Sequence, residues 1–324
     1  MRLVRYILYC VLAYLLFSFT LAIILGEWAL RPVRIPLHMR TSAQSAFARF
    51  GAGLQDVSIN ASDGTRLEAW FARPASSNGN AVILVHGVGD NREGMVGFAQ
   101  LFLSSGYSVL LPDSRGNGLS GGFPTYGILE ARDVHDWYNW LENSQHVHCV
   151  FGMGESMGAA IVLQSTRRTP FCAVVAESPF ADFRQIAYIR VGQIFHSGEW
   201  VGFALRPTVE LALVYGKLKR GVYLANAAPD KEVRQTRVPI LLIHGLQDSN
   251  IPARQSELIR AQNPEHIVIW EVPGADHCGA SSVEPEQFRE RVLSWFNSHE
   301  LRRTTALHTQ SSSSSACTRP VIPI

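Results

Sequence analysis

The sequence predicts an α/β protein in which helices cover both faces of a mostly parallel, eight-stranded sheet, preceded by one transmembrane helix. Short apolar runs suited to buried strands alternate with helical segments along most of the 324 residues. A Gly-x-Ser-x-Gly sequence follows one of these runs, and an apolar run begins the chain. We therefore expect an N-terminal anchor over 1–30, an α/β domain over 31–300 and a tail over 301–324.

The apolar run of the N-terminus covers residues 6–25 and contains no charged residue. As a helix, about 20 such residues span the hydrocarbon core of a bilayer. Trp28 and several arginines follow, as expected at a membrane interface. A cleaved signal peptide is the alternative, with a small-x-small site at Thr20–Ala22, but the apolar run continues past that site and favours an uncleaved anchor. Arginines flank both ends of the helix, so the distribution of basic residues is a weak guide to its orientation. A cytoplasmic N-terminus is favoured, which places the following domain outside the cytoplasm.

Within this domain, strand and helix patterns start to alternate near residue 56. The expected strands cover 57–61, 65–72, 81–85, 107–111, 147–151, 172–176, 240–243 and 267–272. Asp63-Gly64 predicts a hairpin turn between the first two. The expected helices cover 93–105, 127–141 and 156–169. In such a sheet, ligands bind at the carboxyl ends of the parallel strands.

Residues 181–238 interrupt this alternation. The segment is long for a crossover, rich in aromatic and apolar residues, and lacks a strand-like run. We interpret it as a mainly helical lid over the strand ends, which would shape an acyl or leaving-group pocket. The alternative is an extra helical layer that packs on the core.

Composition narrows the classes of partner. The net charge is only +2, and the chain carries no basic run, so nothing indicates nucleic-acid binding. The five cysteines show no metal-ligand spacing, and Cys149 and Cys172 are expected to be small core residues. The Ser-rich segment 311–315 predicts a disordered tail.

The sequence Gly154-Glu155-Ser156-Met157-Gly158 lies between a predicted strand and a predicted helix. This is the context of a nucleophile elbow, in which the glycines let strand and helix approach closely and the serine hydroxyl is exposed at the helix N-terminus. A serine hydroxyl is a weak nucleophile unless a base takes its proton and an acid orients that base. Ser156 is therefore the candidate nucleophile.

The candidate acid and base follow two later strands. Asp248 comes just after the strand at 240–243, and His277 comes just after the strand at 267–272. The order Ser, Asp, His is the one that accompanies this type of elbow. Two other carboxylates compete: Glu177 ends the preceding strand and suits a structural or lid contact better, and Asp276 adjoins His277, which leaves it badly placed for the far ring nitrogen.

An oxyanion that develops beside Ser156 needs preorganised N–H donors. The Met157 N–H follows from the elbow, and the Val88 N–H from the loop after the strand at 81–85.

His86 and His244 precede glycines at strand ends and are expected to hold loops rather than to react. Cys278 is expected to be an inert small side chain. No metal or cofactor is implied.

These residues resemble those of the α/β-hydrolase superfamily. The resemblance covers about 56–296 and rests on the elbow together with HGVGDNREGM (86–95), PDSRGNGLSGG (112–122), YGILEARDV (126–134), ESPF (177–180), PILLIHGLQDSNIP (239–252) and VPGADH (272–277). The nearest resemblance is to the serine-aminopeptidase-like, prolyl-oligopeptidase-related branch, which includes membrane-anchored hydrolases. It implies an α/β-hydrolase fold and no cofactor. The HGGG loop of some lipases and esterases is absent.

The function expected from these features is hydrolysis of a carboxylic ester or thioester, through an acyl-enzyme on Ser156. A bilayer tether beside an apolar lid favours a small-molecule or lipid acyl substrate. Two alternatives stay open: a serine peptidase or aminopeptidase with the same three residues, and a catalytically silent protein that binds a ligand under the lid.

Overall fold

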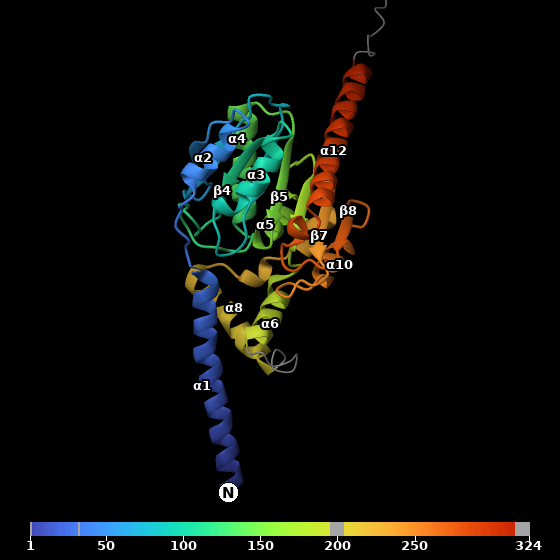
Figure 1. Cartoon of the computed structure of the whole chain (residues 1–324). Coiled ribbons are helices and arrows are strands. Elements are labelled where there is room, and N and C mark those ends of the chain that lie inside the picture. Colours follow the sequence, from blue (N-terminus) through green and yellow to red (C-terminus); the bar gives the residue numbers. More distant parts are fainter. Residues whose placement is uncertain (1, 32, 195–203, 315–324) are drawn as a thin grey trace, which may run out of the picture.

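The fold was obtained as a computed structural model that describes residues 2–31, 33–194 and 204–314, with residues 301–314 described by their backbone alone (Figure 1). Eight strands form one sheet in the order β1-β2-β4-β3-β5-β6-β7-β8. β1 and β2 pair antiparallel, as do β2 and β4, and the other pairs are parallel. The strands are β1 (Gln55–Asn60), β2 (Arg66–Ala72), β3 (Ala81–Val85), β4 (Ser108–Pro112), β5 (Val150–Glu155), β6 (Val174–Glu177), β7 (Ile240–Gly245) and β8 (Ile267–Val272).

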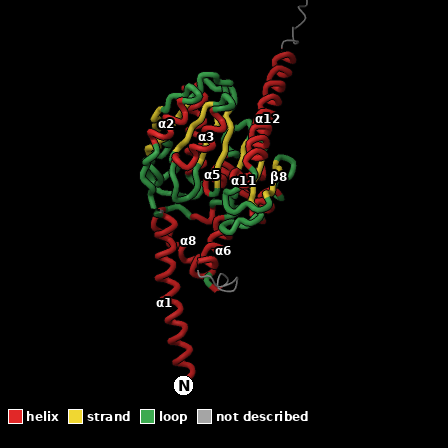
Figure 2. The backbone as a smooth tube through the Cα atoms, viewed as in Figure 1, coloured by secondary structure: helices red, strands yellow, loops and turns green. Residues whose placement is uncertain are grey.

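Helices cover both faces of the sheet, as predicted. Phe47, Phe102 and Phe296 pack on one face and Trp137, Leu163 and Ile259 on the other. Figure 2 shows the strands between these layers. The first layer contains α2 (Arg40–Ala48), η1 (Arg92–Met95), α3 (Val96–Leu103), α11 (Ala280–Val283) and α12 (Pro285–Ser314), and the second α4 (Glu130–Gln145), α5 (Met157–Ser165), α9 (Pro229–Glu232), η3 (Val233–Gln235) and α10 (Arg254–Arg260).

The segment between β6 and β7 is helical, in agreement with the sequence pattern. It contains α6 (Phe183–Ile194), α8 (Arg206–Arg220) and η2 (Leu224–Asn226), followed by α9 and η3; residues 195–203 lie outside the described residues. Phe180, Phe183, Val209 and Leu213 form a third apolar cluster here, and Leu30 of the N-terminal helix belongs to it. The insertion therefore has a core of its own, shared with the start of the chain.

Helix α1 (Arg2–Leu30) is long and apolar enough to cross a membrane, judged by length and composition. Its first part projects away from the domain, whereas its last part runs beside α8 (Figure 1). An anchor and a signal sequence would both pass the same test, so anchoring stays a prediction. The predicted tail over 301–324 also stays a prediction: α12 is helical to Ser314, and residues 315–324 lie outside the described residues.

The prediction for two cysteines is confirmed only in part, because both lie in the core, as predicted, but are bonded to each other. Cys149 and Cys172 are not separate core side chains but form a disulfide with a Cα–Cα distance of 5.9 Å. The bond joins the residues just before β5 and β6, which are neighbours in the sheet, and both cysteines are buried. Disulfides of this kind persist mainly in oxidising compartments.

Loss of this disulfide should destabilise the domain. Because the bond closes a loop across 23 residues, we expect Cys149→Ala/Cys172→Ala to lower the free energy of unfolding by about 3 kcal/mol, chiefly through the unfolded state. Denaturation in urea measures this difference.

Thiol counting checks the bond itself. Denatured protein purified without reductant should react with maleimide at two more sites after reduction than before, and the double variant should show no such gain. An equal count before and after reduction in the wild type would contradict the disulfide.

Candidate active site

A tight turn between β5 and α5 presents Ser156. Its backbone has φ 52° and ψ −114°, a strained conformation for a residue with a side chain. A Cβ on Gly154 would lie 2.4 Å from the carbonyl carbon of Gly158, and a Cβ on Gly158 would lie 2.0 Å from the carbonyl oxygen of Val85. Only glycine fits at both positions, so the two glycines of the motif are required by the close approach of α5 to the sheet.

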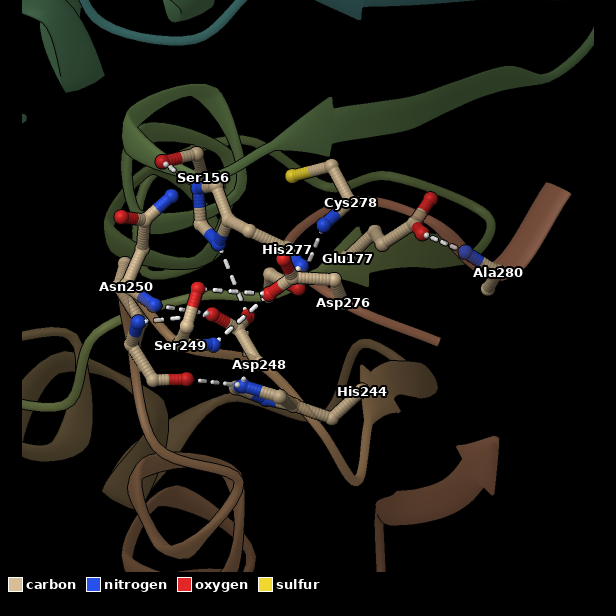
Figure 3. A network of polar contacts seen from close by, with 12 residues as sticks. Ser156, Glu177, His244, Asp248, Ser249, Asn250, Asp276, His277, Cys278 and Ala280 are labelled. Carbon is tan, nitrogen blue, oxygen red and sulfur yellow. Dashed lines mark hydrogen bonds and ion pairs between the residues drawn. The ribbon is translucent and has the colours of Figure 1, made fainter. Parts of the chain in front are cut away.

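The three residues predicted from separate loops meet at the strand ends (Figure 3). The Oγ of Ser156 lies 2.9 Å from Nε2 of His277, and Nδ1 of His277 lies 2.8 Å from Oδ2 of Asp248. Asp248 follows β7 and His277 follows β8, as the sequence pattern indicates. In this order a proton can pass from the hydroxyl to Nε2 while the carboxylate holds the other side of the ring.

Asp248 is held as a carboxylate. Its Oδ1 accepts from the N–H groups of Asn250 at 3.0 Å and Ile251 at 2.8 Å, and Nε2 of His244 lies 3.3 Å from Oδ2. Burial alone would raise the pKa of this carboxyl, but the hydrogen bonds from His244, His277 and Ile251 together lower it well below its ordinary value. Asp248 is therefore charged at neutral pH and can stabilise a protonated His277.

The two competing carboxylates have other roles in the structure. Oδ1 of Asp276 accepts hydrogen bonds from the N–H groups of Ser249 and His277, both at 2.8 Å, and from the hydroxyl of Ser249 at 2.9 Å. It thus ties the loop that carries Asp248 to the loop that carries His277. Glu177 is buried, and its Oε1 accepts from the Ala280 N–H at 3.0 Å, which fixes the turn after His277.

The two predicted oxyanion donors belong to elements that adjoin Ser156. Met157 is the first residue of α5, where backbone N–H groups lack helical partners. A Cβ on Gly87 would lie 3.6 Å from the Cβ of Ser156, so the loop that carries Val88 passes beside Ser156. Their role as donors stays a prediction.

His86 fixes the Val88 loop, which agrees with its predicted role. Its Nε2 accepts from the Ser114 N–H at 3.0 Å, and its Nδ1 lies 2.7 Å from the carbonyl oxygen of Gly87. Burial lowers the pKa of this ring, and the neutral tautomer with a proton on Nδ1 satisfies both contacts.

Cys278 follows the candidate base and borders the site. Burial, followed by the nearby charges of Glu155 and Glu177, raises the pKa of its thiol, so the group is uncharged at neutral pH. Its N–H donates to the Ser178 hydroxyl at 3.2 Å. An unreactive thiol is what the sequence predicts here.

Glu155 is an acidic group that the sequence does not single out. It precedes Ser156 and pairs with Glu177 in the register of β5 and β6. Burial first, and then the charges of Glu177 and Asp90, raises the pKa of its carboxyl to about 8. At neutral pH Glu155 is therefore mostly protonated, which keeps an additional negative charge away from Ser156.

A cavity of about 460 Å³ opens on Ser156 and His277. Most of its wall is apolar, and the insertion contributes a large share of it, including Phe183 and Val191 of α6 and Leu213 of α8. Leu25 and Trp28 of α1 also line it, which the sequence analysis missed. The sequence does contain a signal for this contact. The small residues Ser18, Ala22 and Gly26 recur every fourth residue, a spacing that favours close helix packing.

Comparisons with known proteins give the family that the sequence matches. A sequence model described as the alpha/beta hydrolase family matches residues 82–291, more than half of the chain. The uncharacterized protein YqkD of Bacillus subtilis is 29% identical over 223 residues, which cover 66% of this chain and 70% of that protein. The thermostable monoacylglycerol lipase of Bacillus sp. strain H-257 is 24% identical over 233 residues, which cover 67% and 90%.

Solved structures show the same fold. The esterase Pf2001 of Pyrococcus furiosus has a TM-score of 0.66 at 23% identity, covering 83% of this chain and 97% of that chain. An alpha-beta serine hydrolase homologue from Coxiella burnetii has a TM-score of 0.53 at 18% identity, covering 74% and 96%. At these identities the likeness concerns the fold alone.

The raised pKa of Glu155 makes stability depend on pH. Between its ordinary value of 4.5 and about 8, the unfolded state loses this proton while the folded state retains it, so the group's contribution to stability falls as pH rises. We expect Glu155→Gln to raise the free energy of unfolding by about 1–3 kcal/mol at pH 9 and to change it little at pH 5. Urea denaturation at both pH values tests this, and an equal effect at both would contradict it.

Proposed function

Because this chain belongs to the alpha/beta hydrolase family, we propose that it is a serine hydrolase that cleaves carboxylic ester or thioester bonds through an acyl-enzyme. One observation carries the proposal. The hydrogen-bonded series Ser156, His277 and Asp248 ends at a mostly apolar cavity, so an acyl group in that cavity would present its carbonyl carbon to the serine.

Acylation begins with proton transfer. As the Oγ of Ser156 attacks the carbonyl carbon, Nε2 of His277 takes the hydroxyl proton, and a new C–O bond forms. Asp248 stabilises the imidazolium through the 2.8 Å contact to Nδ1. The bond to the leaving alkoxide or thiolate then breaks, and that group departs with the proton from His277.

The tetrahedral intermediate requires stabilisation of its oxyanion, which we assign to the N–H groups of Met157 and Val88. Water then attacks the acyl-enzyme and gives its proton to His277. That proton returns to the Oγ of Ser156 when the free acid leaves. The protein's own residues thus complete each proton transfer, and the balance needs no co-reactant other than water.

An ester fits the cavity better than a peptide. Among the lining residues that the structure describes, Asp90 and Glu155 are the acidic ones, and they are the groups that would hold a free amino terminus. Burial keeps Glu155 mostly protonated at neutral pH, which leaves one charge for that purpose. A relative named as a monoacylglycerol lipase also favours an ester. Membership of the serine-aminopeptidase-like branch stays a prediction, and peptidase activity is the alternative.

We also assign α1 to the membrane, with the hydrolase domain outside the cytoplasm. The length and apolarity of the helix support an anchor. The disulfide between Cys149 and Cys172 supports an oxidising compartment for the domain. Arg2 and Arg5 at the other end of the helix then face the cytoplasm, where basic residues are favoured.

The two carboxylates beside His277 offer a matched pair of variants. Asp248→Asn should lower kcat for a p-nitrophenyl ester about 10⁴-fold, because the ring loses the partner that fixes its tautomer. Asp276→Asn removes a charge but keeps an oxygen that can accept the same loop hydrogen bonds, so it should lower kcat less than about tenfold. Comparable losses in both variants would mean that Asp248 acts on the fold rather than on the base.

Covalent labelling separates a hydrolase from a catalytically silent binding protein. A fluorophosphonate should label the wild type and leave Ser156→Ala unlabelled, because only an activated serine reacts. An unlabelled wild type would contradict the proposed function. A panel of p-nitrophenyl esters and aminoacyl amides then identifies the bond cleaved, and amide turnover at comparable kcat/KM would favour the peptidase.

A further inference from the structure

We infer that the last turns of α1 form one wall of an acyl-chain site, and that a long-chain monoacyl lipid enters it sideways from the bilayer around α1. The inference rests on the proposed function and names its substrate class. It makes the N-terminal helix a determinant of specificity in addition to an anchor.

The cavity beside Ser156 extends to α1. Leu25, Gly26, Trp28 and Ala29 line it from that helix, and Val209, Ala212, Leu213 and Gly216 line it from α8. This end of the cavity is apolar, whereas its polar lining residues, such as Asp90, Glu155 and Asn250, come from other elements. Its volume of about 460 Å³ lies in the range of pockets that hold one small ligand, which favours one acyl chain over two.

Helices α1 and α8 are closely packed. They run parallel, because Tyr14 donates to the Ala204 carbonyl at 3.0 Å near one end and Glu27 accepts from Lys219 near the other. A Cβ on Gly26 would lie 2.7 Å from Cδ1 of Tyr215, so only glycine allows this approach. Removal of α1 would open the cavity on this side.

Further contacts fix α1 relative to the nucleophile. Glu27 also accepts from the Tyr215 hydroxyl. The hydroxyl of Tyr126 donates to the Ala29 carbonyl at 3.0 Å, and the Tyr126 ring packs on Phe183 of α6 with 4.4 Å between centroids. Tyr126 itself lines the cavity. The wall formed by α1 therefore has a set position in the site.

The outer surface beside the cavity suits a bilayer. Residues 2–17 of α1 are exposed and almost entirely apolar beyond Arg5. The exposed side of α8 carries Leu211, Val214 and Leu218, the last 82% exposed. The last turn of α8 is basic and lies level with Glu27, and Trp28 is 60% exposed nearby. Aromatic and basic side chains at one level are typical of the membrane interface.

Entry of the lipid from the bilayer avoids the free-energy cost of exposing its acyl chain to water. Moving an acyl chain through water exposes its methylenes to solvent, at a free-energy cost that grows with each methylene. A chain that passes between the leaflet and the apolar wall of α1 and α8 stays out of water. Long chains therefore gain most from this route, and short soluble esters gain nothing.

A substitution that fills the cavity from α1 tests whether this helix forms a wall of the acyl-chain site. Ala29→Phe places a ring in the cavity, and Ala13→Phe places the same ring on an exposed part of α1. We measure kcat/KM of the full-length protein in phosphatidylcholine vesicles for p-nitrophenyl laurate and butyrate. The laurate-to-butyrate ratio should fall at least tenfold in Ala29→Phe and stay unchanged in Ala13→Phe. An unchanged ratio in Ala29→Phe would overturn the inference.

Labelling by a small fluorophosphonate shows whether Ala29→Phe retains a folded site. If it does not, Ala29→Leu and Ala212→Phe, which fill the cavity from α1 and from α8, must lower the same ratio. Failure of the proposed function gives a different result: the wild type then cleaves neither ester, and no ratio exists.

A shared-membrane experiment tests the route. A monoacylglycerol with an 18-carbon chain is supplied either in the vesicles that contain the protein or in separate vesicles at the same total concentration. We expect the initial rate to be at least tenfold higher in the shared vesicles. Equal initial rates would overturn sideways entry, because substrate would then arrive through water.

Discussion

The close approach of α5 to strands β3 and β5 is the constraint on which the rest of the structure depends. At Gly154 and Gly158 the backbones leave no room for a Cβ, and the turn between them forces Ser156 to a positive φ. The turn therefore presents the Ser156 side chain at the carboxyl ends of the strands. The parallel register from β5 through β8 then brings the loops that carry Asp248 and His277 to the same edge.

Much of the fold was predictable because buried strands are continuous apolar runs. The strands at 81–85 and 267–272 have the predicted bounds. β5 differs: the pattern predicts a strand over 147–151, and the structure has Val150–Glu155. Gly152 and Gly154 resemble turn residues, but here a Cβ on Gly152 would lie 2.9 Å from Val162 of α5. The glycines are thus part of the strand because α5 packs on it.

Features that depend on distant neighbours were not predictable. The pairing of Cys149 with Cys172 follows from the adjacency of β5 and β6, which neither cysteine signals alone. The role of α1 in the cavity depends on contacts such as that of Glu27 with Lys219, 192 residues away. By contrast, Ser156, Asp248 and His277 were predictable as a set, because each follows a recognisable strand and chain order constrains which of them can meet.

The bond between the Tyr126 hydroxyl and the Ala29 carbonyl joins the end of α1 to the domain. Together with the packing of α1 on α8, this bond makes the connection between α1 and the domain rigid. In a bilayer, a rigid connection to α1 fixes the height and tilt of the whole domain relative to the membrane. Ser156 would then be held at one depth of the leaflet. That depth would decide which of several carbonyls in a lipid Ser156 can reach.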